Sequence, residues 1–229
     1  SHEQRDRGIG QEGKAVPAPE RFPEQLGVRL HDDQRDRGPD AEGIILDGPA
    51  GLGNRRLAIV DLEGGAQPMR DPATGVTLVY NGEVFNYVEL REELLSRGHG
   101  FYTSSDTEVI LHLYEETGPR CLERLNGQFA FAIWDSRNRE LFLARDRVGI
   151  RPLHYAVEGG RLFFASEIKS LFASGGVPRR IDPIALDEVF TFWTTLPGRT
   201  VFRDVRELPP GHCLRAAKGG TSVHKFWEL

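Results

Sequence analysis

Apolar and polar positions follow two periods along the chain from residue 43 onward, and each period predicts one kind of element. Short apolar or alternating runs bounded by turn residues predict strands. They cover residues 43–46, 55–62, 76–84, 128–134, 140–145, 153–157 and 161–166. Apolar residues three and four positions apart predict helices over 87–97, from 106 or 107 to 116, over 120–125 and over 184–192.

The order of these elements indicates a fold class. The last four strands follow one another closely, and turn residues separate them at 135–138 and at Gly159-Gly160. This spacing is typical of antiparallel hairpins. Strands, then a pair of helices, then more strands predict an α+β layered domain rather than a regular βαβ array.

Residues 1–36 do not share this pattern. They are crowded with charge, contain Pro17, Pro19 and Pro23, and hold few apolar residues. Such a composition predicts a disordered segment. The whole chain has 229 residues and 39% hydrophobic content, which suits one globular domain with a tail.

Charge and cysteine content narrow the function classes. The net charge is -5 and both signs are mixed along the chain, which argues against a nucleic-acid or anionic-membrane surface. No apolar run is long enough to span a bilayer, and no early segment has the pattern of a signal peptide. Two cysteines, Cys121 and Cys213, make no disulfide framework and predict a reducing cytoplasm. The histidines, including His99, His112 and His154, show no metal-ligand spacing, so no metal site is expected.

Short motifs recur in a fixed order from residue 37 onward. They occupy residues 37–40 (RGPD), 53–61 (GNRRLAIVD), 67–69 (QPM), 81–87 (NGEVFNY), 105–110 (SDTEVI), 125–131 (LNGQFAF), 145–147 (RDR), 149–153 (GIRPL) and 165–169 (ASEIK). With this series the chain resembles the N-terminal class II glutamine amidotransferase domain of glutamine-hydrolysing asparagine synthetases, an N-terminal-nucleophile (Ntn) hydrolase. The resemblance implies a four-layer αββα sandwich and L-glutamine as substrate.

The resemblance also implies which residues bind the two charged groups of glutamine. A guanidinium pairs with a carboxylate through two parallel hydrogen bonds, and the resemblance assigns this role to Arg56. The backbone around Ile59 and Val60 lines the same end of the site. The α-ammonium needs a fixed carboxylate, which the resemblance assigns to Asp106.

A third part of the site is implied at residues 81–83. Hydrolysis of the amide creates an oxyanion, which needs donors fixed in advance. The resemblance assigns the Asn81 side-chain amide and the Gly82 backbone N–H as these donors, with Glu83 in the same turn against the substrate. A glycine at 82 also lets the backbone approach a ligand closely.

Each assignment has a structural rival. Arg56 could be a surface arginine on a strand, Asp106 a simple helix cap, and Asn81-Gly82 an ordinary hairpin turn. The ordered motifs favour the substrate roles. For Arg145-Asp146-Arg147 and for Glu167, a structural charge network or a contact with a partner domain is expected instead.

The chain departs from the family at its nucleophile. The mature family members begin with Cys-Gly-Ile, whose thiolate attacks the amide with the free α-amine as base. Here Arg7 stands before Gly8-Ile9, and arginine is neither a nucleophile nor a base at neutral pH. The same segment is a central strand in the family, yet residues 1–10 hold one strongly apolar residue. The fold is therefore expected to be incomplete at its N-terminal strand.

Three explanations account for this departure: an upstream coding-frame error, a decayed gene, or a retained non-hydrolytic relative such as the β-lactam-forming synthetases. Ser1 as a replacement nucleophile is the least favoured, because no strand pattern follows it. Loss of a nucleophile costs about a million-fold in turnover in known hydrolases, so hydrolysis is expected to be absent or trace.

The expected organisation has three parts. Residues 1–36 form the divergent segment, 37–195 the amidotransferase domain, and 196–229 a linker toward a synthetase domain outside this chain. ATP and Mg²⁺ would belong to that domain, so no cofactor is expected here. Ser174–Val177 begins like a phosphate loop, but Pro178-Arg179 follows, which favours a helix-ending turn.

Two functions follow from the resemblance. The first is glutamine binding and hydrolysis that supplies ammonia for aspartate amidation, impaired here by loss of the cysteine. The alternative is a non-catalytic pseudo-amidotransferase that binds or scaffolds a synthetase partner. Partners implied are L-glutamine and a synthetase domain or subunit, with a homodimer as a further option.

Overall fold

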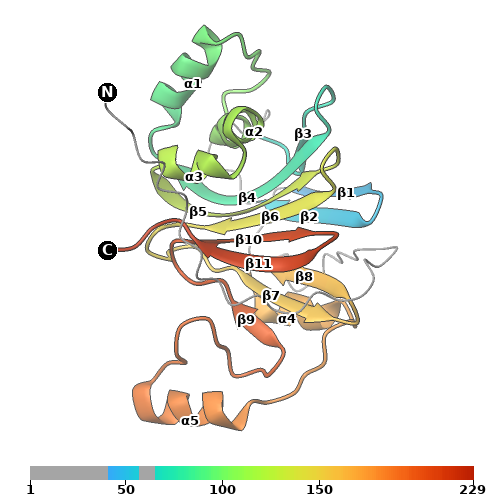
Figure 1. Ribbon diagram of the computed structural model, residues 1–229, viewed down its shortest axis with the longest axis vertical. Coiled ribbons are helices and arrows are strands. Elements are labelled where there is room, and N and C mark those ends of the chain that lie inside the picture. The colour runs from blue at the N-terminus through green and yellow to red at the C-terminus, as the bar shows by residue number, and fades with distance from the viewer. Residues whose placement is uncertain (1–40, 57–64) are drawn as a thin grey trace, which may run out of the picture.

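Four layers stack in the part of the chain that the structure describes. The computed structural model describes residues 41–56 and 65–229. Helices cover one face of a large sheet, a smaller sheet and a hairpin lie against its other face, and two more helices follow below (Figure 1). The predicted segment 1–36, including Ser1 and Arg7, lies outside the described residues, as does the strand predicted there.

The large sheet has six described strands in the order β11-β10-β6-β5-β4-β3, and every neighbouring pair is antiparallel. Its strands are β3 (Met69–Arg70), β4 (Val76–Val84), β5 (Gly127–Asp135), β6 (Glu140–Arg145), β10 (His212–Ala217) and β11 (Gly220–Lys225). β4 and β5 pair along their whole length, with Gly82 opposite Phe129.

The smaller sheet has the order β8-β7-β9, and a separate hairpin joins β1 to β2. Its strands are β7 (His154–Glu158), β8 (Arg161–Ala165) and β9 (Val205–Glu207). The hairpin consists of β1 (Ala41–Asp47) and β2 (Ala50–Arg56). The antiparallel pairs β5–β6 and β7–β8 confirm the hairpins predicted from the sequence.

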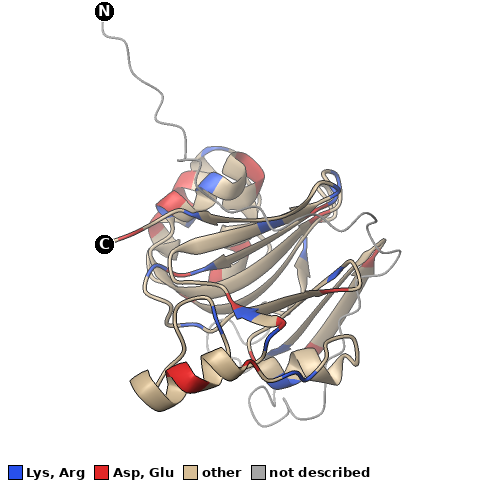
Figure 2. Cartoon of the chain, turned by 60° about the horizontal axis from the view of Figure 1, so that its bottom comes forward, with Lys and Arg blue, Asp and Glu red and all other residues tan. Residues whose placement is uncertain are grey.

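Helices form the two outer layers. Those over the large sheet are α1 (Tyr87–Ser96), α2 (Asp106–Thr117), the short 3₁₀ turn η2 (Gly118–Arg120) and α3 (Cys121–Arg124). α4 (Ile168–Ala173) and α5 (Pro183–Phe192) lie on the opposite side. No helix in the described ranges combines the length and apolar character that a membrane span needs. Lys, Arg, Asp and Glu are scattered over helices, strands and loops (Figure 2).

Three buried clusters fill the three spaces between the layers. On β5, Phe129, Phe131 and Ile133 face α2 and α3, whereas Ala130 and Trp134 with their neighbours face the smaller sheet. A third cluster joins β7 and β8 to α4. Because both faces of the central strands are buried, these strands read in sequence as almost unbroken apolar runs. The α+β, four-layer αββα class is thereby confirmed.

Several boundaries agree with the sequence and others do not. Strands 76–84 and 140–145 have the predicted bounds. Residues 50–53, expected to be a turn, belong to β2, because they pair with β1 across the Gly48-Pro49 turn. Residues 196–229 are not a linker: β9 joins the smaller sheet, and β10 and β11 extend the large one. The folded unit thus continues beyond residue 195. Strand residues predicted at 57–62 lie outside the described ranges.

Candidate functional site

One edge of β4 is open along the stretch that carries Asn81 and Gly82. β3 pairs with β4 only at Thr77 and Leu78, while β5 pairs along its other edge. Side chains take over on the open edge: the Tyr80 N–H donates to Gln67 Oε1 over 2.6 Å, and the Val84 N–H donates to Asp106 Oδ2 over 3.0 Å. Alternation along a strand places the Gly82 N–H on the same edge, between these two donors.

Asp106 is the first residue of α2, but it does not cap the helix. Ser105 is the N-cap, and its hydroxyl accepts from the Thr107 N–H over 3.2 Å. The Asp106 carboxylate instead reaches β4, where Oδ2 accepts from the Tyr80 hydroxyl over 2.7 Å and from the Val84 N–H. Asp106 is 5% exposed, and no cationic side chain of the described ranges pairs with it. The helix-cap explanation for Asp106 is therefore wrong.

Gln67 joins four of the sequence motifs. Its Oε1 accepts from Asn54 Nδ2 over 3.0 Å and from the Tyr80 N–H, and its Nε2 donates to Thr107 Oγ1 over 3.5 Å. Burial, followed by the charge of Asp106, raises the pKa of Tyr80 far above its ordinary range, so this hydroxyl stays a donor. The network fixes β2, β4 and α2 around the open edge.

Gly82 is required by its neighbours in the sheet. Its φ is +152°, and a Cβ there would lie 2.0 Å from Gln128 O and 2.7 Å from Phe129 Cα. The close approach is thus made by β5, whereas the sequence suggested a ligand as its cause. Asn81 and Gly82 lie inside β4, so the hairpin-turn explanation is also wrong. The side chains of Asn81 and Glu83 are exposed.

The remaining predicted site residues lie at or beyond the limit of the described chain. Arg56 ends β2, with its backbone paired to Ala41, and its side chain is outside the described residues. Ile59 and Val60 are also outside them. The roles of all three stay predictions.

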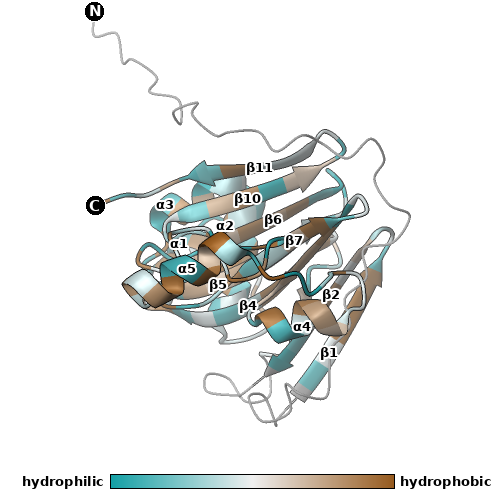
Figure 3. Ribbon diagram, turned by 90° about the horizontal axis from the view of Figure 1, so that it is seen from below, coloured by the Kyte–Doolittle hydropathy of each residue, from teal (hydrophilic) through white to brown (hydrophobic). Residues whose placement is uncertain are grey.

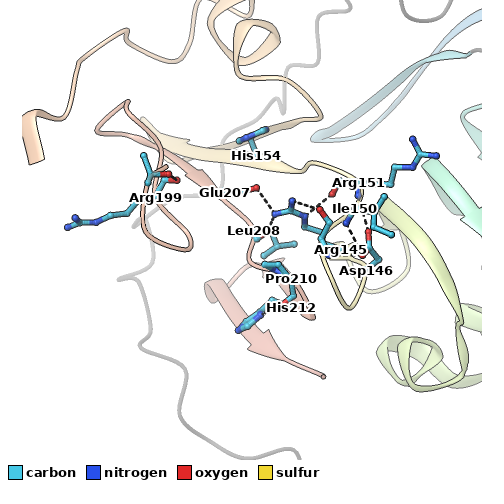
Figure 4. A network of polar contacts seen from close by, with 12 residues as sticks. Arg145, Asp146, Ile150, Arg151, His154, Arg199, Glu207, Leu208, Pro210 and His212 are labelled. Carbon is cyan, nitrogen blue, oxygen red and sulfur yellow. Dashed lines mark hydrogen bonds and ion pairs between the residues drawn. The ribbon is translucent and has the colours of Figure 1, made fainter. Parts of the chain in front are cut away.

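Arg145 and Asp146 form the charge network expected of them (Figure 4). The Arg145 guanidinium reaches from β6 to Glu207 Oε1 and to the carbonyl of Leu208, each over 2.7 Å. The fully buried Asp146 carboxylate accepts from five backbone N–H groups, those of Phe129, Val148, Gly149, Ile150 and Arg151. Because Phe129 lies opposite Gly82, this network supports the site from behind.

Sequence reasoning missed Tyr80 and Gln67 as parts of the site. Both stand in or beside quoted motifs: Tyr80 directly precedes Asn81, and Gln67 opens the Gln67–Met69 motif. Their partners lie far away in the sequence, so no local pattern could reveal the contacts. Elsewhere in the fold, His99, His112 and Glu115 bring metal-ligand atoms together, although their spacing matches no metal motif.

Comparisons with known proteins match both the sequence and this fold. A family profile described as a glutamine amidotransferase domain matches residues 16–227. Asparagine synthetase [glutamine-hydrolyzing] 3 of Bacillus subtilis is 41% identical over 204 residues, which cover 88% of this chain and 33% of that protein. Amidase chyE of Penicillium rubens is 37% identical and covers 84% of this chain and 28% of its own length.

A solved structure agrees with these relatives. The glutamine phosphoribosylpyrophosphate amidotransferase of Bacillus subtilis superposes with a TM-score of 0.59 at 26% identity, covering 80% of this chain and 36% of that one. The chain spans about a third of the length of the curated relatives that it matches. It belongs to the glutamine amidotransferase domain family, in the form found in asparagine synthetases, and has the fold of the Ntn hydrolases.

Proposed function

We propose that this chain binds L-glutamine at the open edge of β4. Asp106 binds the α-ammonium, and the Gly82 N–H with the Asn81 side-chain amide contacts the oxygen of the side-chain amide. Arg56 pairs with the α-carboxylate, at the end lined by Ile59 and Val60. The observation that carries the proposal is the Asp106 carboxylate, buried beside this edge without a cationic partner in the described ranges.

The electrostatics of Asp106 support an ammonium ligand. A buried carboxylate costs free energy unless hydrogen bonds and an opposite charge compensate it. Tyr80 and Val84 supply two donors to Oδ2, and a carboxylate has about four acceptor positions. A substrate ammonium would use the remaining positions and supply the missing positive charge. Buried charged groups of this kind mark functional sites.

Binding and hydrolysis are separate claims. The family uses an N-terminal cysteine, and Arg7 stands in its place here. We therefore expect the chain to bind glutamine and to hydrolyse it at most in trace. In a longer parent protein the ammonia would serve aspartate amidation, and ATP and Mg²⁺ would bind the synthetase region. Cys121 and Cys213 are buried free thiols, which fits the cytoplasmic location that we propose.

Calorimetric titration with L-glutamine tests the binding proposal. Asp106→Asn removes the charge and keeps an oxygen that can accept from the Val84 N–H. Asp204→Asn is the control, because Asp204 pairs with Arg180 at the surface, next to β9. We expect saturable binding for the wild type and the control and at least a tenfold loss for Asp106→Asn. Equal affinity in all three proteins would refute the assignment of Asp106.

A second proposal concerns the synthetase region as a partner. α5 and the residues after it expose large apolar side chains, with Phe190 80% and Trp193 93% exposed. Ile181, Ile184, Leu186, Phe192 and Leu196 add to the same surface. α5 lies far from α1 and α2 (Figure 1), and apolar residues stand out along it (Figure 3). Large exposed apolar patches mark interaction sites. We propose that the synthetase region, present in relatives of about three times the length, covers this surface.

Paired substitutions test the docking surface. Phe190→Ser with Trp193→Asn removes two apolar anchors, and asparagine tolerates the left-handed backbone at 193 (φ 62°). Tyr102→Ser is the control, since Tyr102 is 89% exposed on the other side of the molecule, before α2. The probe is the separately expressed synthetase region of the Bacillus subtilis relative. Binding that survives the double substitution would overturn the proposal; loss only there supports it.

A further inference from the structure

A cluster of nitrogen and oxygen ligands lies where the end of α1 meets α2, apart from the β4 edge. His99 comes from the loop after α1, and His112 and Glu115 come from α2. One ligand atom from each of the three lies within 4.8 Å of the others. His112 and Glu115 are three positions apart and so share one face of the helix.

His112 is the buried centre of the cluster. Its side chain is 7% exposed, and its Nδ1 lies 2.8 Å from Glu115 Oε2. Its Nε2 is buried without a hydrogen-bond partner, and the nearest carboxylate oxygen, Glu108 Oε1, is 3.6 Å away. Glu108 already accepts from the backbone N–H groups of Tyr102 and Thr103. One ring nitrogen of His112 thus lacks a partner that neutral imidazole needs.

Carboxylates surround the two imidazoles. His99 Nε2 lies 3.1 Å from Glu116 Oε1, and its ring centroid is 4.9 Å from that of His112. Glu115 and Glu108 are buried beside His112, and the charge of Asp71 acts on it as well. The one cation printed in contact with this group is Arg97, which pairs with Glu116 at the surface. Among the described residues the cluster therefore carries excess negative charge.

We propose that His99, His112 and Glu115 bind a divalent transition-metal ion such as Zn²⁺, with Glu116 as an additional carboxylate ligand. Imidazole and carboxylate together are a common zinc-ligand set, with bonds of about 2.0–2.2 Å. Ligands of one tetrahedral zinc lie roughly 3.4 Å apart, so closure needs side-chain movement of about 1 Å. His99, at the surface with its side chain 21% exposed, can make that movement. The ion would fasten the loop after α1 to α2.

Zinc titration of the whole chain tests this proposal, with calorimetry and thermal unfolding as readouts. His99→Gln removes a half-buried ligand that is not part of a core, and Glu115→Gln keeps an oxygen for the bond from Thr74. His212→Gln is the control, because His212 lies on β10, outside the cluster. We expect one equivalent of Zn²⁺ to bind and to raise the melting temperature of the wild type and the control.

Both cluster variants should bind at least tenfold more weakly than the control. Binding should also weaken at acidic pH, because protonated imidazole cannot ligate. Three results would each overturn the proposal: no binding by the wild type, wild-type affinity in His99→Gln, which places the ion elsewhere, or equal affinity for Mg²⁺, which points to carboxylates alone. Glutamine binding plays no part in these readouts, so they stand apart from the proposed function.

Discussion

The Tyr80 hydroxyl donates a hydrogen bond of 2.7 Å to Asp106 Oδ2, joining β4 to the first residue of α2 inside the fold. Both groups are buried. The contact turns the Asp106 carboxylate toward the strand that carries Asn81 and Gly82. It is the geometric basis for assigning Asp106 to ligand binding.

Replacing Tyr80 by phenylalanine removes the donor and keeps the ring. Hydrogen bonds to buried charged groups are worth about 1.5–3 kcal/mol, so the free energy of unfolding should fall by about 2 kcal/mol. Glutamine affinity should fall several-fold, because Asp106 loses one of its two printed donors. Chemical denaturation and calorimetry measure the two effects. Tyr155→Phe, in the core between the sheets, should leave glutamine affinity unchanged; a matching loss there would mean that the effect is not local.

Gly82→Ala should strongly destabilise the sheet. The added Cβ would meet Gln128 O at 2.0 Å, and the φ of +152° disfavours any L side chain. Strain and overpacking together should cost about 3 kcal/mol or more. Gly100→Ala is the matched control, since a Cβ there meets nothing within 4 Å. The denaturation midpoint measures both, and similar midpoints for the two variants would show that β5 yields freely.

Two histidines should give opposite dependences of stability on pH. At His112, burial opposes protonation most strongly, but the bond to Glu115 and the charges of Glu115, Glu108 and Asp71 outweigh it and raise the pKa. Its contribution to stability is complete below the unfolded pKa near 6.5 and is lost as pH rises through the higher folded pKa. At His154, burial lowers the pKa, so acidification through 6.5 removes its contribution.

NMR titration of the imidazole protons reports both pKa values without added metal. Chemical denaturation from pH 5 to 9 then shows the stability effect, comparing the wild type with His112→Gln and with His154→Gln. The stability difference due to His112 should shrink toward alkaline pH, and that due to His154 toward acidic pH. Parallel curves for the wild type and both variants would contradict this account.

The chain should show no glutaminase activity at rates typical of an enzyme. The family's thiolate is the attacking group, and the internal Arg7 cannot replace it. A coupled assay for glutamate, run against a buffer blank, measures the rate. Turnover at ordinary enzyme rates that Arg56→Ala abolishes would show that another group attacks the amide.

Much of the fold was predictable where burial dominates. β4 and β6 are apolar runs with turn residues at both ends, so their bounds followed from the pattern. β2 was misjudged because Ala50-Gly51-Leu52-Gly53 has turn-like composition, and only pairing with β1 makes it a strand. β11, with Thr221, Ser222 and Lys225, is a polar edge strand that the rest of the sheet holds in place.

The site was predictable only in part, and by resemblance rather than by pattern. Ordered motifs identified Asn81, Gly82 and Asp106, but the sequence could not show what Asp106 contacts. Tyr80 and Asp106 come from different layers, and their meeting depends on how α2 packs over β4. The clustering of His99 with His112 likewise arises from the packing of α1 against α2.

The most direct test compares L-glutamine with glutaramate, the same molecule without its α-amino group, by calorimetric titration of the wild type and Asp106→Asn. If Asp106 binds the ammonium, the wild type should bind glutamine at least tenfold more tightly than glutaramate, and Asp106→Asn should bind the two with equal, weaker affinity. A wild type that binds both equally, or an Asp106→Asn variant that still prefers glutamine, would contradict the central claim.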